Sequence, residues 1–399
     1  MGSRERGQFV LLCAATLFEF TALGIYFSAL PLFVTDELAG SRADVGLAMG
    51  AFAVTAVLLR PFVGQGLDRR GRRPFLVAAP AILLVTSTAF AAVGSVPAVV
   101  GLRLLQGVTG AFFYTAAATV ATDLAPVEKR ADYLARFSLF LYGGFAIGPS
   151  LGEALVRHAF DWAWAAAGAT ALASFVVTLF VQETTPTEAR SEVGARPPLR
   201  FLHPAAIWPG AVILTAATGY TAITAFSALY ARRIGMGSSG PLYATFALSI
   251  LVVRLVAGRL ADRHGRVTVA LPGMALAAAA MVLLAVEPPP PVALVGVGAF
   301  GAGFALVFPA LLALTVDRVP DSERGAAVGS FTAFFDIGAS GGGYAVGAVA
   351  DRVGFAGGFG LPGALCMGGF VILARLGRHV RAEAAAAADE SALPEPAGA

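Results

Sequence analysis

The sequence predicts an all-α integral membrane protein whose twelve transmembrane helices form two pseudo-symmetric six-helix halves. Hydrophobic residues make up 57% of the 399 residues and charged residues only 13%, a balance that water-soluble domains do not have. A helix needs about 20 apolar residues to cross a bilayer. The chain contains twelve such runs, at residues 8–33, 43–66, 75–94, 97–122, 132–155, 162–181, 205–229, 239–260, 268–286, 292–316, 325–348 and 356–376.

A repeat at constant spacing divides the chain into two halves. The segment from Gly64 to Arg73 reads Gly-Gln-Gly-Leu-Asp-Arg-Arg-Gly-Arg-Arg, and 194 residues later the segment from Gly258 to Val267 reads Gly-Arg-Leu-Ala-Asp-Arg-His-Gly-Arg-Val. The same spacing relates Arg60 to Arg254, Asp123 to Asp317, Pro126 to Pro320, Arg130 to Arg324 and Gly144 to Gly338. A spacing that does not drift over about 80 residues indicates a duplicated unit. We therefore assign residues 1–182 to the first half and 205–380 to the second.

The positive charges predict how the chain is oriented in the membrane. Most of the 28 Lys and Arg residues fall in the terminal segments and the even-numbered loops, and positive loops stay on the cytoplasmic side. Both termini and the polar, proline-bearing linker 183–204 are therefore expected in the cytoplasm, in a multi-pass protein of the plasma membrane. The net charge of +3 reflects this topology and does not indicate a nucleic-acid partner. Residues 381–399 are rich in Ala, Glu and Pro without an apolar period, and we expect a disordered tail there.

The duplicated loop resembles the loop between spans two and three of the major facilitator superfamily of secondary transporters. Its second copy matches the family signature Gly-x-Leu-Ala-Asp-Arg-x-Gly-Arg at nearly every position. The first copy departs from the signature at Gly66, where Leu is usual. The resemblance covers roughly residues 8–380 and favours the 12-span drug/proton antiporter type.

In that family the loop charges hold the cytoplasmic side closed when the cavity faces outward, and the resemblance implies the same role here. A carboxylate beside a helix N-terminus and an arginine holds two helices together. Arg60 and Arg254 lie four residues before the motif glycines, about 6 Å deeper in the membrane, and we assign them to the gate as well. The other gate residues are Asp68, Arg69, Arg72, Asp123, Arg130, Asp262, Arg263, Arg266, Asp317 and Arg324. The alternative is a solvated turn that only fixes topology.

Three charged residues within spans occur in only one half. At the spacing of 194, Glu19 corresponds to Ile213, Arg103 to Val297 and Asp336 to Tyr142. An ionisable group inside a bilayer is costly unless it is paired, hydrated or neutralised. The repeat cannot explain these residues, so they are candidates for the chemistry of transport.

Glu19, near the middle of span one, is the predicted principal proton-coupling acid. Burial disfavours the charged form of a carboxyl group and a nearby cation favours it, so such a group can bind and release a proton. Some proton-coupled multidrug exporters of the resembled family carry an acid at a similar place. The alternative is a structural acid paired with an arginine or a helix carbonyl. Asp336, in span eleven, is interpreted as a second proton site, a cation contact or the partner of Arg254.

Two further segments resemble motifs of the same family. Arg103, Gln106 and Gly107 match its span-four motif, which implies that Arg103 lines the cavity and either tunes Glu19 or binds an anionic substrate. Its span-five antiporter motif is a bent, closely packed helix at the interface between the halves. The matching residues are Gly144, Gly148, Pro149 and Gly152, while Ala135 stands where the first glycine of the motif is expected.

The composition also bears on the substrate. The chain has no Asn, whereas sugar sites depend on side-chain amides that bind hydroxyl groups. With 29 Phe and several tyrosines within spans, the cavity is expected to accept an apolar, aromatic or amphipathic compound. The predicted cavity tyrosines are Tyr26, Tyr114, Tyr142 and Tyr220.

These observations predict a secondary active transporter that moves a small apolar or amphipathic molecule by alternating access, most simply as proton-coupled export. A proton-coupled importer of an organic anion that uses Arg103 is the alternative with the same fold. A membrane protein that binds a partner without transporting it is the alternative from a different class. The sequence has no metal-ligand cluster, nucleotide-binding loop or nucleophile–base pair, so we expect neither an enzyme nor a cofactor. The expected partners of a monomeric protein are a small molecule, protons and the bilayer.

Overall fold

The computed structural model is helical throughout the residues that it describes, which are 3–126, 129–184, 202–257, 264–320 and 323–391. The long helices are α1 (Ser3–Leu32), α2 (Arg42–Arg70), α3 (Arg73–Ala89), α4 (Val96–Asp123), α5 (Arg130–Val156), α6 (Phe160–Thr178), α7 (Ile207–Arg233), α8 (Gly240–Ala257), α10 (Arg266–Ala285), α11 (Pro290–Val316) and α12 (Arg324–Ser391). A short π-helix, η1 (Phe33–Glu37), extends α1. Two 3₁₀ turns, η2 (Phe90–Ala92) and η5 (Pro204–Ala206), follow α3 and precede α7.

The last element, α12, contains two helices. Val353 and Gly354 have non-helical backbone angles, with a φ of 75° at Gly354, so the chain changes direction there. A positive φ favours glycine because it has no β-carbon to clash with the backbone. We call residues 324–352 the first arm of α12 and residues 355–391 the second arm. In the described part of the chain, ten other long helices and these two arms give twelve, as the sequence predicted.

Length and composition make these helices membrane spans. Ten described helical segments are long and apolar enough to cross a bilayer, and one of them, Ala326–Arg378, covers most of both arms of α12. The segment Gly240–Val256 of α8 is apolar but shorter. Large apolar side chains such as Leu58, Val85 and Val256 are exposed on the outside of the molecule. In water such exposure would be unfavourable, but lipid is a suitable environment for these side chains.

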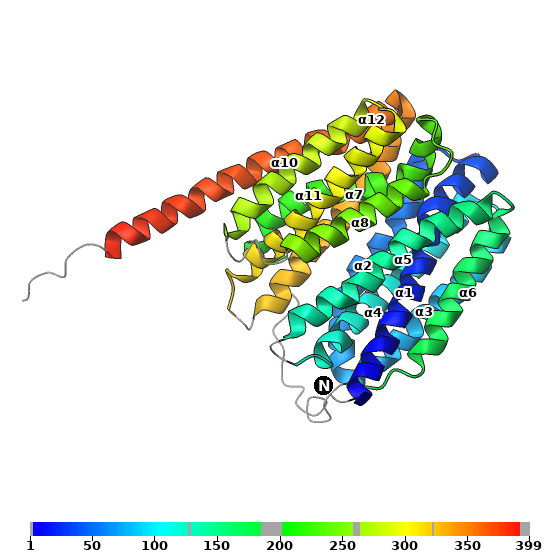
Figure 1. The fold of residues 1–399 in the computed structure, drawn as a ribbon, viewed down its shortest axis with the longest axis horizontal. Coiled ribbons are helices and arrows are strands. Elements are labelled where there is room, and N and C mark those ends of the chain that lie inside the picture. The colour runs from blue at the N-terminus through cyan, green and yellow to red at the C-terminus, as the bar shows by residue number, and fades with distance from the viewer. Residues whose placement is uncertain (1–2, 127–128, 185–201, 258–263, 321–322, 392–399) are drawn as a thin grey trace, which may run out of the picture.

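The helices form two bundles that lie side by side (Figure 1). The first bundle, coloured blue to green, contains α1 to α6, and the second, coloured green to red, contains α7 to α12. Between the bundles, α2 packs against the first arm of α12, and α5 packs against α8. A smaller contact joins α1 to α7.

The duplicated loop has the same backbone turn in both halves. Gly71 and Gly265 are 194 residues apart, and their φ angles are 92° and 89°. Each glycine stands immediately before the region where the next helix begins, at α3 and at α10. Positive φ angles of this kind strongly favour glycine, which explains the glycine of the loop motif.

Helix packing repeats at the same spacing. A β-carbon on Gly144 of α5 would clash with Phe20 of α1. At the equivalent place in the second half, a β-carbon on Gly338 would clash with the backbone of Leu214 in α7. The two halves therefore share both loop geometry and helix register, which supports the interpretation of a duplicated unit.

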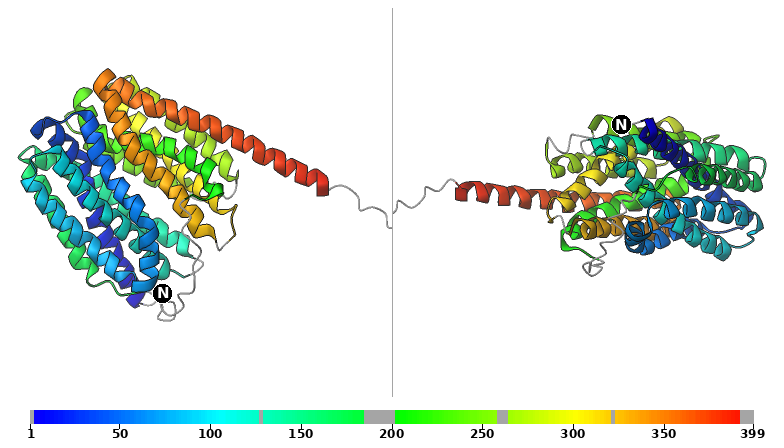
Figure 2. Two further views of the ribbon diagram at one scale, coloured as in Figure 1. Left: turned by 180° about the vertical axis from the view of Figure 1, so that it is seen from behind. Right: turned by 90° about the horizontal axis from the view of Figure 1, so that it is seen from below.

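The C-terminal tail differs from the prediction. We expected disorder from residue 381, whereas the second arm of α12 is helical to Ser391 and extends well beyond the two bundles (Figure 2). Residues 382–388 are alanine except for Glu383. Alanine has the highest helix propensity, and extending an existing helix avoids the cost of nucleation. An apolar period is therefore not needed for this segment to be helical.

Candidate functional site

Two arginines reach across the interface between the halves. Arg60 of α2 forms a hydrogen-bonded ion pair with Asp336 on the first arm of α12. Arg254 of α8 lies over the ring of Tyr142 on α5, with 5.0 Å between the guanidinium carbon and the ring centroid. The members of one contact are 194 residues from the members of the other. The same cross-interface contact is therefore made twice, once as an ion pair and once as a cation–π contact.

The partner of Asp336 is not the one that the sequence suggested. Arg254 was one candidate, but Asp336 pairs with Arg60 instead. The physical reason is helix packing, because α2 lies along the first arm of α12 whereas α8 lies along α5. The side chain of Asp336 is 5% exposed and that of Arg60 is 29% exposed. The carboxylate is thus nearly buried, and the arginine reaches it from a more open position.

Aromatic residues from both halves lie near Arg254. Tyr142 and Tyr220 lie within electrostatic range of its guanidinium group, and Tyr114 lies within range of Tyr142. The ring of Tyr220 packs against those of Phe246, Phe304 and Phe335 at centroid distances of 5.5, 5.3 and 5.6 Å. Three of the four predicted cavity tyrosines therefore come together, and they do so around an arginine that was assigned to the gate.

A cavity of about 190 Å³ lies beside Arg254, between α5 and α8. Its lining residues are Leu134, Ala135, Ser138, Leu139, Leu251, Arg254 and Leu255. Ser138 is one helical turn from Tyr142, so the cavity and the aromatic cluster meet at the arginine. The Nε of Arg254 is buried and has no hydrogen-bond partner among the described residues.

Glu19 lies inside the first half rather than at the interface. Its side chain is fully buried, and Ser174 of α6 lies next to its carboxyl group. Tyr26, seven residues further along the same face of α1, stacks on Trp164 of α6. Neither carboxyl oxygen of Glu19 has a hydrogen-bond partner in the part of the chain that the structure describes. The expected position of Glu19 in a cavity between the halves is therefore not seen in this conformation.

Arg103 and Gln106 are also directed into the first half. The guanidinium of Arg103 donates to Gln106 Oε1 at 2.8 Å and to a backbone carbonyl of α2 at 3.4 Å. It lies over the rings of Tyr26 and Phe52, at 5.4 and 4.9 Å from their centroids. Since the Glu19 oxygens have no partner among the described residues, no ion pair joins Glu19 to Arg103 there. Arg103 is 3% exposed and Tyr26 is fully buried, and the contacts described here for both lie within the first half.

At the predicted outer end, a carboxylate from each half binds the start of a helix in the other half. Glu153, near the end of α5, accepts hydrogen bonds from the backbone nitrogen and the hydroxyl of Ser239 at the start of α8, both at 2.6 Å. Asp351, near the end of the first arm of α12, accepts bonds from the backbone nitrogens of Arg42 and Ala43 in α2, both at 2.9 Å. Helix N-termini carry unpaired N–H groups and partial positive charge, which a carboxylate stabilises.

Further contacts close the same end. They join Arg232 to Asp36 at 2.7 Å, Arg157 to the Gly237 carbonyl at 2.6 Å and Tyr243 to the Phe27 carbonyl at 2.6 Å. A β-carbon on Gly46 of α2 would overlap the carbonyl of Gly343, so these two helices cross at closest approach there. The two halves are therefore tightly joined at the predicted outer end.

The described charges of the duplicated loops pair within their own halves. Arg72 lies 3.3 Å from Asp123, and Arg266 lies 3.1 Å from Asp317. The two pairs are again related by 194 residues, so the duplicated charges form equivalent contacts. Arg69, Arg130 and Arg324 are exposed nearby. The side chain of Asp68 and the residues Asp262 and Arg263 lie outside what the structure describes.

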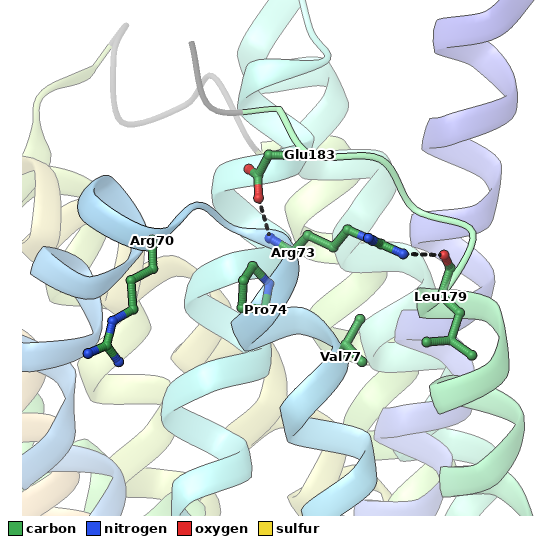
Figure 3. Close-up of a pocket in the computed structure, with 6 residues that line it drawn as sticks. All are labelled: Arg70, Arg73, Pro74, Val77, Leu179 and Glu183. Atoms are coloured by element: carbon green, nitrogen blue, oxygen red, sulfur yellow. Dashed lines mark hydrogen bonds between the residues drawn. The ribbon is translucent and has the colours of Figure 1, made fainter. Parts of the chain in front are cut away.

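Glu183 adds a further carboxylate to the first-half cluster. It accepts hydrogen bonds from the backbone nitrogens of Arg72 and Arg73, at 2.9 and 3.1 Å, where α3 begins. The guanidinium of Arg73 donates to the Leu179 carbonyl at 2.9 Å, just after α6 (Figure 3). A surface pocket of about 500 Å³ lies beside these groups, and the side chain of Arg70 on its edge points away from Arg73 (Figure 3). The charges around this pocket do not converge on one point.

The span-five glycines pack inside the first half, which differs from the expectation. A β-carbon on Gly144, Gly148 or Gly152 would clash with α1, and Ser28 of α1 donates to the Pro149 carbonyl at 2.8 Å. Residues four apart lie on one face of a helix, and this face of α5 is turned toward α1. α5 does contact α8 in the second half, but through other residues.

Three functional candidates were missed by the sequence interpretation: Glu153, Asp351 and Glu183. Glu153 had a recognisable signal, because a carboxylate in the last turn of a helix opposes the dipole of that helix and suggests a partner elsewhere. Asp351, in the last turn of the first arm of α12, carries the same signal, whereas Glu183 follows α6 and has none, since its partners lie 110–111 residues away in the chain.

Comparison with known proteins identifies the family. The model of the Major Facilitator Superfamily matches residues 12–253 and 237–397. The chain belongs to this superfamily. An uncharacterised MFS-type transporter of Salmonella typhimurium is 28% identical over 344 residues, which cover 81% of this chain and 84% of that protein. An uncharacterised MFS-type transporter of Burkholderia mallei is 27% identical over 338 residues, covering 83% and 82% of the two chains.

Solved structures share the fold. A bacterial homologue of the human lysosomal transporter Spinster, in an inward-facing and occupied conformation, has a TM-score of 0.76 at 14% identity, covering 95% of this chain and 98% of its own. The nucleoside transporter NupG has a TM-score of 0.75 at 15% identity, with 92% and 98% covered. The human organic anion transporter MFSD10 has a TM-score of 0.69 at 18% identity, with 93% and 100% covered. At these identities the likeness shows the fold alone.

The protein is therefore a multi-pass membrane transporter of the MFS type and not an enzyme. Membership of the superfamily implies a small-molecule substrate and a surrounding bilayer. The contacts of Arg60 and Arg254 lie between the two halves.

Proposed function

We propose that this transporter exports a small apolar or amphipathic molecule across the plasma membrane in exchange for protons, by alternating access. If both termini are cytoplasmic, as the arginine distribution predicts, the closed end is the outer end and the structure is inward-facing. The observation that carries the proposal is the ion pair between Arg60 and Asp336, because it joins the two halves and contains a titratable acid.

A proton on Asp336 would weaken the attraction between the halves at this level. The charged carboxylate binds the Arg60 guanidinium across the interface, whereas a neutral acid attracts it much less. The paired state in the structure then corresponds to a carrier that has released its proton to the cytoplasm. After substrate binds and the halves reorient, a proton from outside would neutralise Asp336 and release Arg60 for the return step.

The equivalent contact, between Arg254 and Tyr142, would not be weakened by a proton. Arg254 lies over Tyr142, which has no carboxylate to neutralise. Proton coupling is therefore assigned to one of the two related contacts, while the other remains available for substrate.

Glu19 is the second proposed proton site. We predicted it as the principal coupling acid, but it lies beside α6 and makes no hydrogen bond or ion pair with the second half among the described residues. Burying a carboxylate without a cation is costly. Loss of a proton from Glu19 would therefore require a rearrangement of α1 against α6.

The duplicated loops are proposed to close the cytoplasmic end in the outward-facing state. In the inward-facing arrangement their described pairs, Arg72 with Asp123 and Arg266 with Asp317, stay within separate halves. Reorientation would bring the two clusters together, so that carboxylates of one half meet arginines or helix N-termini of the other.

The two alternatives are less well supported. Import of an organic anion through Arg103 is disfavoured because Arg103 is buried inside the first half. A membrane protein that binds without transporting would not need one end closed by contacts between similar halves. This second alternative predicts ligand binding without flux.

Transport by the purified protein in liposomes with an imposed pH gradient tests the proposal. A panel of lipophilic compounds, sugars and organic acids is offered, and we expect gradient-driven movement of lipophilic compounds, including acids that carry an apolar group, and none of the sugars. Asp336→Asn should lose gradient-driven accumulation while keeping exchange of substrate without a gradient. Asp161→Asn, which changes an exposed carboxylate at the start of α6, is the matched control and should behave as the wild type. Accumulation that ignores the pH gradient in the wild type would refute proton coupling, and binding without flux would favour the non-transporting alternative.

A further inference from the structure

We propose that the substrate of this transporter carries an aromatic ring and a negative charge, and that Arg254 binds the charge. The inference rests on the proposed transport function and names the chemical class for the site between the halves. Its basis is an arginine without an anionic partner among the described residues, beside a cavity and a wall of aromatic rings.

At the level of Arg60 and Arg254, the described charges between the halves leave one arginine without an anionic partner. Arg60 and Asp336 neutralise each other in their ion pair. Arg254 has only the face of the Tyr142 ring, and no described carboxylate pairs with it. Glu19 and Arg103 are directed into the first half and do not contribute a contact here. An unneutralised cation within a bilayer is costly, so its presence indicates that an anion binds there for part of the cycle.

The surroundings of Arg254 favour an aromatic ligand. Tyr220 and the three phenylalanines packed on it present ring faces and edges from α7, α8, α11 and α12. Tyr142 and Tyr114 add rings and hydroxyl groups from the first half. The cavity of about 190 Å³ beside Arg254 exceeds the roughly 150 Å³ that holds one benzene molecule. Apart from Arg254 and Ser138 its lining is aliphatic, so a ring can occupy the cavity while its carboxylate reaches the guanidinium.

A cationic ligand does not fit the same group of residues. Aromatic faces attract cations, but the face of Tyr142 already holds the guanidinium of Arg254. A second positive charge at this place would be repelled by the first. The carboxylate of Asp336 is occupied by Arg60 and lies on the other pair of helices.

A matched series of ligands separates charge from ring. The compounds are 4-phenylbutyrate, 4-phenylbutanol and 4-phenylbutylamine, which share one ring and one chain and differ in charge at pH 7. Their dissociation constants for the full-length protein in detergent are measured by calorimetry at fixed pH. We expect 4-phenylbutyrate to bind about tenfold more tightly than the alcohol, as a hydrogen bond to a charged group allows. The amine should bind most weakly.

Variants of Arg254 test whether this residue causes the preference for the acid over the alcohol and the amine. Arg254→Gln should lose about tenfold in affinity for 4-phenylbutyrate while keeping its affinity for the alcohol. Arg254→Lys keeps the charge and should still prefer the acid to the amine. Arg375→Gln removes an exposed arginine of the second arm of α12 and should leave all three affinities unchanged. Retained binding of the alcohol shows that Arg254→Gln is folded.

Several results would overturn the inference. They are tightest binding of the amine, an equal affinity for acid and alcohol, an unchanged affinity of Arg254→Gln for 4-phenylbutyrate, or no measurable binding of any of the three by the wild type. Because binding in detergent needs no gradient, these results are independent of proton coupling. A preference for the acid in a protein whose transport ignores pH would refute the proposed function and leave the ligand class standing.

Discussion

The contact between Arg60 and Asp336 and the contact between Arg254 and Tyr142 occupy equivalent places in the two halves, yet they differ in chemistry. The first is an ion pair with an acid that a proton can neutralise, and the second is a cation–π contact in which the arginine has no anionic partner among the residues that the structure describes. A duplicated fold thus supplies two arginines at the interface, and the change of one partner separates their roles. One arginine is assigned to protons and the other to substrate.

The largest difference between the two contacts is expected in gradient-driven transport, when Arg60 and Arg254 are removed in turn. Arg60→Gln leaves Asp336 nearly buried without a cation, and breaking a buried pair in this way costs about 3–5 kcal/mol when both groups are fully desolvated. Because Arg60 is partly exposed, we expect a smaller cost and a loss of gradient-driven accumulation of at least about tenfold.

Arg254→Gln should keep the response to the pH gradient for an uncharged substrate. The measurement is uptake into liposomes at two pH gradients, with protein amounts matched by immunoblot. Equal loss of pH response in both variants would contradict the division of roles between the two contacts.

The next effect concerns the outer end, where Glu153 and Asp351 bind helix N-termini. A carboxylate at a helix N-terminus is worth about 0.3–1 kcal/mol, and up to about 2 kcal/mol when partly buried. Glu153→Gln combined with Asp351→Asn should therefore raise the population that is open at this end by about threefold to tenfold.

A single cysteine at Ser340, which packs on Gly50 of α2 below these contacts, reports the opening. Both native cysteines, Cys13 and Cys366, are buried, and they are replaced first. The rate of reaction with an impermeant thiol reagent added outside should rise in the double variant. An unchanged rate would show that glycine packing alone keeps the end closed.

A moderate effect is expected from Glu19→Gln. The amide keeps the shape of the neutral acid, so the protein should fold with a melting temperature within a few degrees of the wild type. Gradient-driven accumulation should fall less than in Asp336→Asn, because Glu19 lies inside one half. A larger loss in Glu19→Gln than in Asp336→Asn would return Glu19 to the position of principal coupling acid.

The smallest effects are expected from Asp123→Asn and Asp317→Asn. Each removes one partner of a solvent-accessible ion pair, which is worth about 0–1 kcal/mol, so the melting temperature should fall by only a few degrees and to a similar extent in both. Their effect on conformation is tested with a cysteine probe on the cytoplasmic side. Similar changes in labelling would support one shared gate, and a change in only one variant would contradict equivalence of the two clusters.

Much of the fold could be predicted from hydropathy and the repeat. The predicted span 97–122 corresponds to α4, Val96–Asp123, because about 20 apolar residues can be stable only as a buried or lipid-facing helix. The spacing of 194 also predicted that Asp123 and Asp317 would belong to equivalent clusters, and both pair with the arginine eight residues after the motif's first glycine. Local chemistry determines these features, so they can be recognised in the sequence.

The candidate site could be predicted only in part. The sequence indicated that Asp336 and Tyr142 were equivalent, but their partners depend on which helices lie side by side. The direction in which the Glu19 side chain points depends on how α1 is rotated about its axis against α6. Packing between these two helices sets that rotation. Composition indicated an aromatic cavity. The span-four motif offered Arg103 as one possible contact for an anion, but the burial of that residue is a property of the folded first half and could not be read from the motif.

The most direct test of the account is the proton flux that accompanies substrate in liposomes containing a pH-sensitive dye. Addition of a transported substrate should move protons in the wild type and in Tyr142→Phe, and should move none in Asp336→Asn, even though that variant still exchanges substrate. A proton flux in Asp336→Asn equal to that of the wild type would contradict the assignment of coupling to the contact between Arg60 and Asp336.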